Sequence, residues 1–250
     1  MQRLQRLNRV ANTRNGIDLN PVTRPSVTLY GDTMNLGDPL DQDELDLFKA
    51  QFATILAAPG SSERRVMLDR LPVYIIALRA IKLDLKGPKF KGLNPEDTEL
   101  GFGLLRPQFL KHTVGGVSTY RADWTQAFAA AATWTDFLAS TAAVAFAIGE
   151  DFGLCVTHMK SLVTPKPFFA EVRFVVGRTG ILIPGDVRNL SMGDTENNVS
   201  LVPIPSLIAR PKTNLYGRAL SDAIGTGDCA LGGLVIGLGR ALKEETPTWT

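Results

Sequence analysis

Apolar side chains in the first third of the chain recur every three or four positions, which is the spacing of one helix face. From Asp41 this pattern predicts a helix that Pro59 ends. The apolar positions of this helix are Leu45, Phe48, Phe52, Ile55 and Leu56. A second helix is expected to begin around Ser62, and Pro72 should end it or restart it before residues 73–83.

An alanine-rich stretch in the middle of the chain predicts a long buried helix over residues 122–148. The bulky side chains of this helix are Trp124, Phe128, Trp134, Phe137, Leu138 and Phe146. The stretch is long enough to cross a bilayer, but Asp136 near its middle makes insertion costly, by about 2.5–3.5 kcal/mol. We therefore expect no membrane span.

The pattern changes to that of strands after residue 164. Residues 168–176 alternate and are rich in β-branched side chains, which predicts a strand, and residues 180–183 are its expected partner. Pro203, Pro205 and Pro211 favour an irregular or edge-like region. Two helical pieces are expected towards the C-terminus, over residues 216–224 and 230–245, although glycines weaken the second.

These patterns together predict a mainly α fold of the α+β class, with a helical body and a small antiparallel β element. The expected divisions are a basic N-terminal arm (residues 1–38), a mainly helical core (39–230) and a glycine-rich C-terminal helix or tail (231–250). The β element is placed around residues 168–204. Residues 86–118 are expected to be rich in loops, because Gly-Pro, Asn-Pro and Gly-Gly pairs punctuate them.

Composition is that of an ordinary globular chain: of 250 residues, 44% are hydrophobic and 21% are charged. The net charge of +2 excludes a polycation but hides a strong segregation along the chain. Residues 1–30 contain Arg3, Arg6, Arg9, Arg14 and Arg24 against Asp18 alone. Residues 31–48 contain acidic charges only: Asp32, Asp38, Asp41, Asp43, Glu44 and Asp46. Residues 79–91 are basic again.

The basic residues 79–91 include Phe90, and lysines interleaved with an aromatic ring suit the binding of single-stranded nucleic acid. The predicted nucleic-acid-binding residues are Arg79, Lys82, Lys86, Lys89, Phe90, Lys91 and Arg121. An exposed loop made soluble by its lysines is an equally good interpretation of this segment.

In the N-terminal arm, arginines alternate with apolar residues at a period of three. The pattern suits phosphate contacts, a helix that docks on a neighbouring subunit, or a helix at a membrane surface, and a frayed terminus is the simplest alternative. A basic arm and an acidic segment would also pair between copies of the chain. The expected oligomerisation residues are Arg3, Leu4, Arg6, Leu7, Arg9, Val10, Asp41, Asp43 and Glu44.

Two motifs suggest cofactor or metal chemistry, and neither is specific. Residues 225–230 match the glycine pattern of dinucleotide-binding loops but lack its strand-and-helix context, so a turn with Asp228 capping a final helix explains them as well. Cys155 and His158, with His112 and Cys229, are the donor types that zinc prefers, but they lack a second closely spaced pair. The cysteines are most simply buried thiols, and we assign no metal and no cofactor.

Acid–base chemistry has one candidate, the adjacent carboxylates Glu150 and Asp151, with His158 or His112 as a partner. The chain contains no G-x-S-x-G, no P-loop and no H-E-x-x-H motif. We therefore assign no catalytic residue, and a soluble intracellular enzyme is the alternative function rather than the expected one.

Segregated charge and the lack of a catalytic pattern favour a self-assembling structural protein that coats single-stranded RNA, of the viral nucleocapsid or coat type. Exchange of N-terminal arms would link the protomers, and a groove of Arg and Lys would bind the RNA backbone. A protein-only tube or shell component is a further alternative. The expected location is a virion or the host cytoplasm, because residues 1–10 do not resemble a secretory signal.

Overall fold

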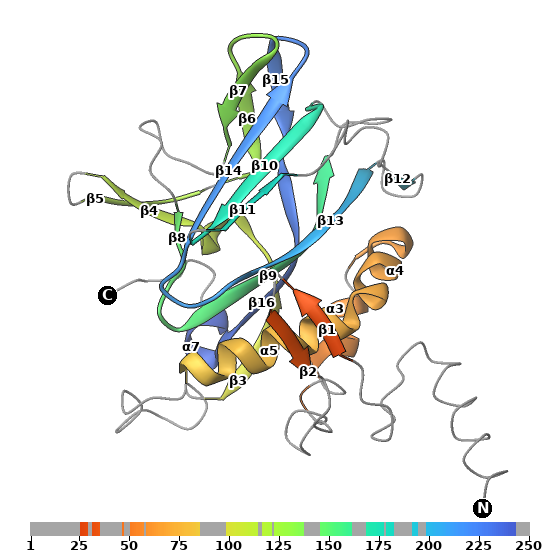
Figure 1. Cartoon of the computed structure of the whole chain (residues 1–250), viewed down its shortest axis with the longest axis vertical. Coiled ribbons are helices and arrows are strands. Elements are labelled where there is room, and N and C mark those ends of the chain that lie inside the picture. The colour runs from red at the N-terminus through yellow and green to blue at the C-terminus, as the bar shows by residue number, and fades with distance from the viewer. Residues whose placement is uncertain are drawn as a thin grey trace, which may run out of the picture.

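The computed structural model describes residues 26–29, 32–35, 47, 51–57, 59–85, 99–114, 117–121, 123–137, 146–161, 169–177, 179–182, 192–194 and 199–243. This part of the chain is mostly β, and all of its strand pairs are antiparallel (Figure 1). The prediction of a mainly helical body is therefore wrong. The helices of residues 53–85 form one layer at the lower side of the molecule, and strands form most of the rest (Figure 1).

A five-stranded sheet lies at the centre of the fold. Its strand order is β12 (Met192–Asp194), β13 (Val199–Ala209), β9 (Phe152–Ser161), β16 (Ala230–Leu238) and β3 (Leu100–Leu104). The two inner strands, β9 and β16, are buried along almost their whole length. A strand buried on both faces has no polar side to alternate with its apolar side, so it reads as one continuous apolar run.

A seven-stranded sheet packs against the five-stranded one. Its order is β11 (Thr179–Leu182), β10 (Glu171–Val176), β14 (Asn214–Ser221), β8 (Phe146–Ala147), β4 (Lys111–Val114) and β5 (Val117–Tyr120), with β7 (Thr133–Asp136) also paired to β14. Two small sheets complete the β structure: β6 (Thr125–Phe128) with β15 (Gly225–Asp228), and the hairpin of β1 (Ser26–Leu29) and β2 (Asp32–Asn35).

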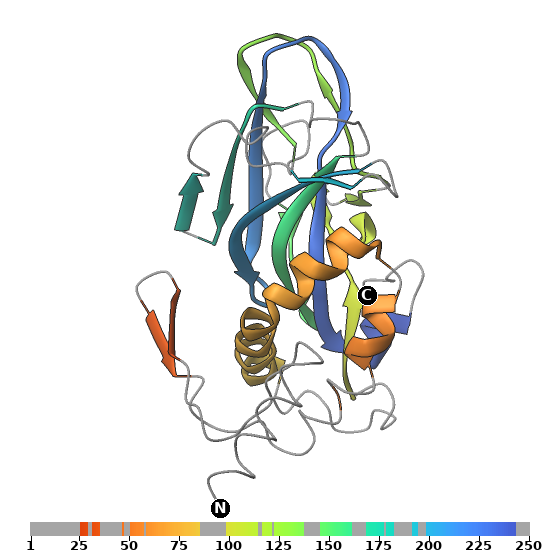
Figure 2. The same cartoon turned by 90° about the vertical axis from the view of Figure 1, so that its right-hand side faces the viewer.

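The helices cover the other face of the five-stranded sheet (Figure 2). They are α3 (Ala53–Ala57), α4 (Ser61–Asp69) and α5 (Leu71–Leu85), while α7 (Gly239–Lys243) follows β16, and a 3-10 helix, η3 (Pro107–Phe109), follows β3. The predicted helix boundaries at Pro59, Ser62 and Pro72 are confirmed to within two residues. Pro72 lies in the first turn of α5, where its missing N–H leaves no helical hydrogen bond unmade.

The fold thus has three layers and two cores. Leu154 and Val156 of β9 pack with Phe174 of β10 and Leu215 of β14 in the core between the two sheets. Cys155, between those two β9 residues, belongs instead to the core beneath the helices. Successive side chains of a strand point to opposite faces, so one central sheet supplies both cores.

Close packing of α5 on the central sheet depends on a residue without a side chain. A Cβ added to Gly153 of β9 would lie 2.6 Å from Cδ1 of Ile81 and 2.9 Å from the carbonyl oxygen of Ala209. Both distances are shorter than real Cβ contacts, and one neighbour is backbone that cannot turn aside. Glycine at this position therefore lets the helix approach the strand.

Three predicted helices are strands in the structure. The alanine-rich residues 122–148 contain β6, β7 and β8, residues 216–224 contain most of β14, and residues 230–245 contain β16 followed by the short α7. In residues 214–221 and 230–238 burial in the two large sheets outweighs helix propensity. The mostly half-buried or exposed β6 and β7 are held by pairing with the distant strands β15 and β14, which overrides the high helix propensity of alanine. Residues 86–118 were expected to be rich in loops, but residues 100–104, 111–114 and 117–120 are strands.

The strand pair predicted at residues 168–176 and 180–183 is confirmed, but it belongs to the seven-stranded sheet and not to a small β element. Residues 171–176 form β10, and residues 179–182 form its antiparallel partner, β11. Pro203 and Pro205 lie in β13 beyond the end of its short partner β12, at a shift in the register with β9. This placement agrees with the expectation of an irregular, edge-like region, because proline cannot donate a ladder hydrogen bond.

Candidate functional site

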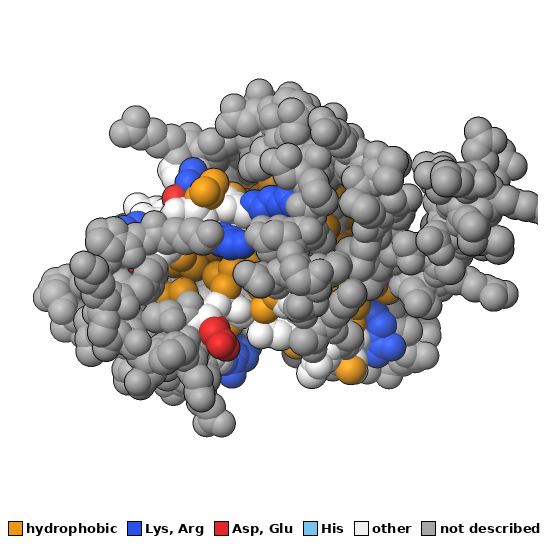
Figure 3. Space-filling view, turned by 90° about the horizontal axis from the view of Figure 1, so that it is seen from below, with side chains coloured by type: hydrophobic (Ala, Val, Ile, Leu, Met, Phe, Trp, Pro, Cys, Tyr) orange, Lys and Arg blue, Asp and Glu red, His pale blue; other side chains and the backbone are white. Residues whose placement is uncertain are grey.

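Only part of the predicted RNA-binding set lies in the described structure. Arg79 and Lys82 lie on α5, which runs along the lower side of the molecule in Figure 1. Seen from below, Lys and Arg side chains lie at several places around apolar ones on this side (Figure 3). Lys86, Lys89, Phe90 and Lys91 continue the chain from α5 and lie outside the described residues.

Arg121 follows β5, and its guanidinium group donates hydrogen bonds to three backbone carbonyls. Its Nε lies 2.7 Å from the Asp123 oxygen, one terminal nitrogen lies 3.0 Å from the Thr125 oxygen, and the other bonds the oxygen of Phe137. These contacts join β5, β6 and the end of β7. Since they use the Nε and both terminal nitrogens, Arg121 acts here as a structural residue, and its contact with RNA stays a prediction.

The predicted oligomerisation residues, Arg3 to Val10 and Asp41 to Glu44, lie outside the described residues. Within the predicted N-terminal arm the structure describes the hairpin β1–β2, in which Val27 pairs with Met34 and Leu29 with Asp32. Among the described strands, β1 and β2 pair only with each other. In Figure 2 the hairpin stands apart from the two large sheets.

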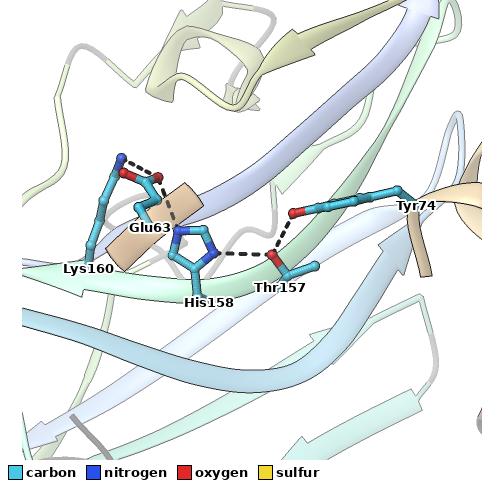
Figure 4. A network of polar contacts seen from close by, with 5 residues as sticks. All are labelled: Glu63, Tyr74, Thr157, His158 and Lys160. Atoms are coloured by element: carbon cyan, nitrogen blue, oxygen red, sulfur yellow. Dashed lines mark hydrogen bonds and ion pairs between the residues drawn. The ribbon is translucent and has the colours of Figure 1, made fainter. Parts of the chain in front are cut away.

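A buried network of polar side chains joins the helix layer to β9 (Figure 4). The hydroxyl oxygens of Tyr74 and Thr157 are 2.8 Å apart, and the Thr157 oxygen lies 3.1 Å from Nδ1 of His158. Nε2 of His158 lies 3.1 Å from a carboxylate oxygen of Glu63, which also accepts a hydrogen bond from Lys160 at 2.9 Å. Tyr74 comes from α5, Glu63 from α4, and the other three from β9.

A bulge in β9 brings two consecutive side chains to the same side. His158 pairs with Gly232 and Pro203, and Val156 pairs with Gly233 and Leu207, so the ladders on both sides of the strand skip Thr157. The extra residue of a bulge redirects the side chains next to it. Thr157 and His158 therefore both reach partners in the helix layer.

The imidazole of His158 lies directly over Gly232 of the neighbouring strand. A Cβ at position 232 would lie 2.0 Å from Nε2 of His158 and 2.4–2.5 Å from two of its ring carbons. No side chain fits there while the ring keeps its place. The glycine is thus part of the network, although it donates and accepts no hydrogen bond within it.

The charge state of Glu63 sets the direction of the hydrogen bonds. Burial alone would raise the pKa of Glu63, but the hydrogen bond from His158 and the positive charge of Lys160 outweigh it and lower the pKa to about 2. An ionised carboxylate only accepts, so Nε2 of His158 donates to it. In the neutral imidazole Nδ1 then accepts from Thr157, whose oxygen accepts from Tyr74. Each of these four side chains thereby has a hydrogen-bond partner.

A hydroxyl, an imidazole and a carboxylate in sequence are also the parts of a nucleophilic triad. Here Thr157 and His158 are both 0% exposed, and the Thr157 oxygen also bonds Tyr74. A substrate has no access to this hydroxyl. The network therefore fastens α4 and α5 to the central sheet, and its role is structural.

The residues predicted for acid–base chemistry are not brought together. Glu150 is half exposed and forms an ion pair with Lys212 at 3.0 Å. Asp151 lies immediately before β9, whereas His158 lies towards its other end, and six strand residues span about 20 Å. His112 lies on β4, in the other large sheet.

The remaining motifs have structural roles in the described part of the chain. Residues 225–230 form β15 and the start of β16 and open no helix, so the expectation that Asp228 caps a helix is wrong. Cys155 and Cys229 are buried, unpaired thiols, as expected, and they belong to different cores. Burial raises the pKa of both thiols. Within these ranges no three His, Cys, Asp or Glu side chains gather as metal ligands do.

Sequence reasoning singled out His158 but missed Glu63 and Tyr74, which lie 95 residues from His158 and 83 residues from Thr157 along the chain. The usable signal was the polar pair Thr157–His158 inside an otherwise apolar strand, since buried polar groups require partners.

Comparison of the chain with known protein families, curated proteins and solved structures finds no match. Among the helices of the described ranges, none has the length and apolarity needed to cross a membrane.

Proposed function

We propose that the chain is a self-assembling structural protein that coats single-stranded RNA, of the viral nucleocapsid or coat type. Protomers would be linked by exchange of the N-terminal arm. Basic side chains would hold the RNA backbone. The observation that carries this proposal is the separate hairpin β1–β2, which continues from the arginine-rich start of the chain.

A two-stranded hairpin is marginally stable on its own in water and gains stability by packing on another surface or adding to another sheet. Within the described strands, β1 and β2 have no third strand beside them. Pairing with a neighbouring protomer would supply the missing contact. The same pairing would carry the preceding arginines from one protomer to the next.

The charge pattern supports the same arrangement. Residues 1–30 carry Arg3, Arg6, Arg9, Arg14 and Arg24, and residues 31–48 carry acidic side chains only. Opposite charges on successive segments favour pairing between copies and set its register. Arginines in excess of those pairs would neutralise RNA phosphates and make binding depend on salt.

The proposal is tested on the purified full-length chain by light scattering coupled to gel filtration, together with the ratio of absorbance at 260 and 280 nm. We expect a particle of many protomers that carries nucleic acid. A large particle free of nucleic acid would instead indicate a protein-only tube or shell. A clean monomer or dimer would contradict assembly and return the enzyme alternative to first place.

Two deletions separate the parts of the arm. Removal of residues 1–36 takes away the arginines and the hairpin, and should leave a folded monomer. Removal of residues 1–20 keeps the hairpin but loses Arg3, Arg6, Arg9 and Arg14. The shorter deletion should also leave a folded protein that no longer forms large assemblies, because it removes the predicted oligomerisation residues Arg3 to Val10; particles of full mass would show instead that the hairpin alone links the protomers. Equal particle mass for wild type and the 1–36 deletion would refute arm exchange.

The predicted basic loop has its own test. Replacing Lys86, Lys89 and Lys91 by Glu should weaken RNA binding and flatten its dependence on salt. The log–log slope should fall by about 0.7 for each phosphate that the variant no longer neutralises. An unchanged slope would show that these lysines do not touch phosphate.

A further inference from the structure

The seven-stranded sheet has one face turned away from the core between the sheets. Along β14, Leu215, Gly217 and Ala219 are buried, and the residues between them are half-buried. The outward positions include Tyr216 and Arg218. This strict alternation with a period of two leaves a row of large polar and aromatic side chains on the outer face.

Five residues of β7, β10 and β14 form what we call the outer-face cluster: Trp134, Asp136, Arg173, Tyr216 and Arg218. The guanidinium carbon of Arg173 lies 5.0 Å from the centre of the Trp134 ring, within the range of a cation–π contact. Asp136 accepts the Tyr216 hydroxyl hydrogen bond. Nε of Arg218 lies 2.8 Å from the same carboxylate, an ion pair without hydrogen-bond alignment.

Two arginines lie directly opposite each other at the centre of this cluster. Arg173 of β10 pairs in register with Arg218 of β14, and Arg218 pairs with Asp136 of β7. Like charges opposite each other on neighbouring strands repel. Asp136 compensates Arg218, whereas the exposed Arg173 has its contact with Trp134 but no ion pair among the described residues. Glu171, two positions along β10, is the other acidic group that the described strands β7, β10 and β14 place on this face.

The geometry points to a stacking platform: we propose that the outer-face cluster binds the bases of single-stranded RNA. This inference rests on the proposed function and names the surface that would carry it. The guanidinium group of Arg173 lies over the Trp134 ring, so its other face is available to stack on a base. Its N–H groups lie at the edge of the guanidinium plane, where a phosphate can accept hydrogen bonds from them. The half-buried Tyr216 ring, oriented by its bond to Asp136, supplies a second surface two residues from Arg218.

The charge of the cluster fits stacking better than phosphate binding alone. Two arginines and two carboxylates, Asp136 and Glu171, leave this face close to neutral. Stacking on aromatic rings and guanidinium planes needs no net charge and tolerates any base sequence. The arginines at the start of the chain would add the salt-dependent attraction to the RNA backbone.

The test uses the full-length chain, stripped of bound nucleic acid, and a fluorescein-labelled 20-mer of oligo-uridine as the probe in fluorescence anisotropy. We expect Arg173→Ala to weaken binding between about fivefold and a hundredfold, the range for the loss of one stacked base. Trp134→Ala should do the same, and Trp134→Phe should restore most of the affinity. Arg173→Lys keeps the charge but loses the plane, so it should bind weakly with an unchanged dependence on salt.

Arg65→Ala is the matched control, because Arg65 is an exposed arginine on α4, which lies beneath the other sheet. It removes the same charge and should change affinity by less than about twofold if stacking, not net charge, carries the binding. Far-UV circular dichroism checks that each variant is folded. The exposed Arg173 variants test the proposal even if Trp134→Ala does not fold.

The other outcomes overturn the inference in distinguishable ways. If wild type binds the oligonucleotide and the Arg173 and Trp134 variants bind equally well, the platform is refuted and the proposed function stands. If the variants change particle mass but not affinity, the outer face is an interface between protomers. If wild type does not bind oligo-uridine at low salt, the platform and the RNA-coating function are both refuted.

Discussion

Adding one methyl group at position 232 should disrupt the buried network without altering any polar residue in it. In Gly232→Ala the new Cβ would lie 2.0 Å from Nε2 of His158. A real contact needs more than 3 Å, so the imidazole must leave its place. Its hydrogen bonds to Thr157 and Glu63 are then broken.

The cost follows from those hydrogen bonds. A neutral hydrogen bond contributes about 1 kcal/mol and one to a charged group about 1.5–3 kcal/mol, and forcing extra volume into a packed core adds about 1–3 kcal/mol. Since Glu63 keeps Lys160, part of its stabilisation survives. We expect Gly232→Ala to lower the free energy of unfolding by about 3–5 kcal/mol, a large part of the stability of a typical domain.

Urea denaturation at neutral pH, followed by circular dichroism, measures this change. Gly103→Ala is the matched control, because Gly103 lies on β3 of the same sheet as Gly232. A Cβ at position 103 would meet only Cδ2 of Leu242, at an ordinary contact distance of 3.5 Å. We expect this control to change the free energy of unfolding by less than about 1 kcal/mol, which is the range that strand propensities alone span.

A double mutant locates the cause. Removing the ring with His158→Ala leaves room for the methyl group, so Gly232→Ala should cost less than about 1 kcal/mol in that background. Equal stability of Gly232→Ala and Gly103→Ala would contradict a clash with His158. An unchanged cost of Gly232→Ala in the His158→Ala background would contradict it as well, because the clash would then lie elsewhere.

Three further predictions concern side chains whose surroundings the structure defines. The pKa of Glu63 is lowered from 4.5 to about 2, so the ionised carboxylate stabilises the fold fully above pH 4.5, and this stabilisation is lost as the pH falls through 2. When the free energy of unfolding is measured against pH, wild type should lose up to about 3 kcal/mol over this range, and Glu63→Gln should not show this loss. A lysine at position 121 lacks the planar guanidinium group that donates to three carbonyls, so Arg121→Lys should lower the free energy of unfolding in urea by about 2–4 kcal/mol. The control Arg65→Lys should change it little. Cys155 and Cys229, buried with raised pKa values, should react with a thiol reagent at pH 8 only after urea is added, and rapid labelling of the folded chain would contradict their burial.

The elements that could be predicted are those with local signals. The helices α4 and α5 have apolar spacing of one face and a proline at their junction, and β10 and β11 alternate around a short turn. These signals lie within ten or fifteen residues of each other. Such local signals predict an element without knowledge of contacts to distant parts of the chain.

The elements that could not be predicted depend on contacts between distant segments. Residues 230–238 contain three glycines among apolar residues, and their lack of alternation reflects burial against a sheet on one side and helices on the other. The same applies to the buried network, whose members come from α4, α5 and β9. The outward positions Asn214, Tyr216, Arg218 and Leu220 recur with a period of two, which is a local signal of a strand with one exposed face, although residues 216–224 alone also suit a helix.

The layer order also limits where this fold can meet a partner. Both faces of the five-stranded sheet are buried, one under α4 and α5 and the other against the seven-stranded sheet. By contrast, the described strands β7, β10 and β14 place half-buried or exposed aromatic and charged side chains on the outer face of the seven-stranded sheet. A partner can reach these side chains. In both views the hairpin β1–β2 lies low in the molecule, at the height of α5, whereas β7, which carries part of the outer-face cluster, lies at the top (Figures 1 and 2). An arm bound to a neighbour near its helices would thus leave that neighbour's platform open, so assembly and RNA binding should be separable by mutation.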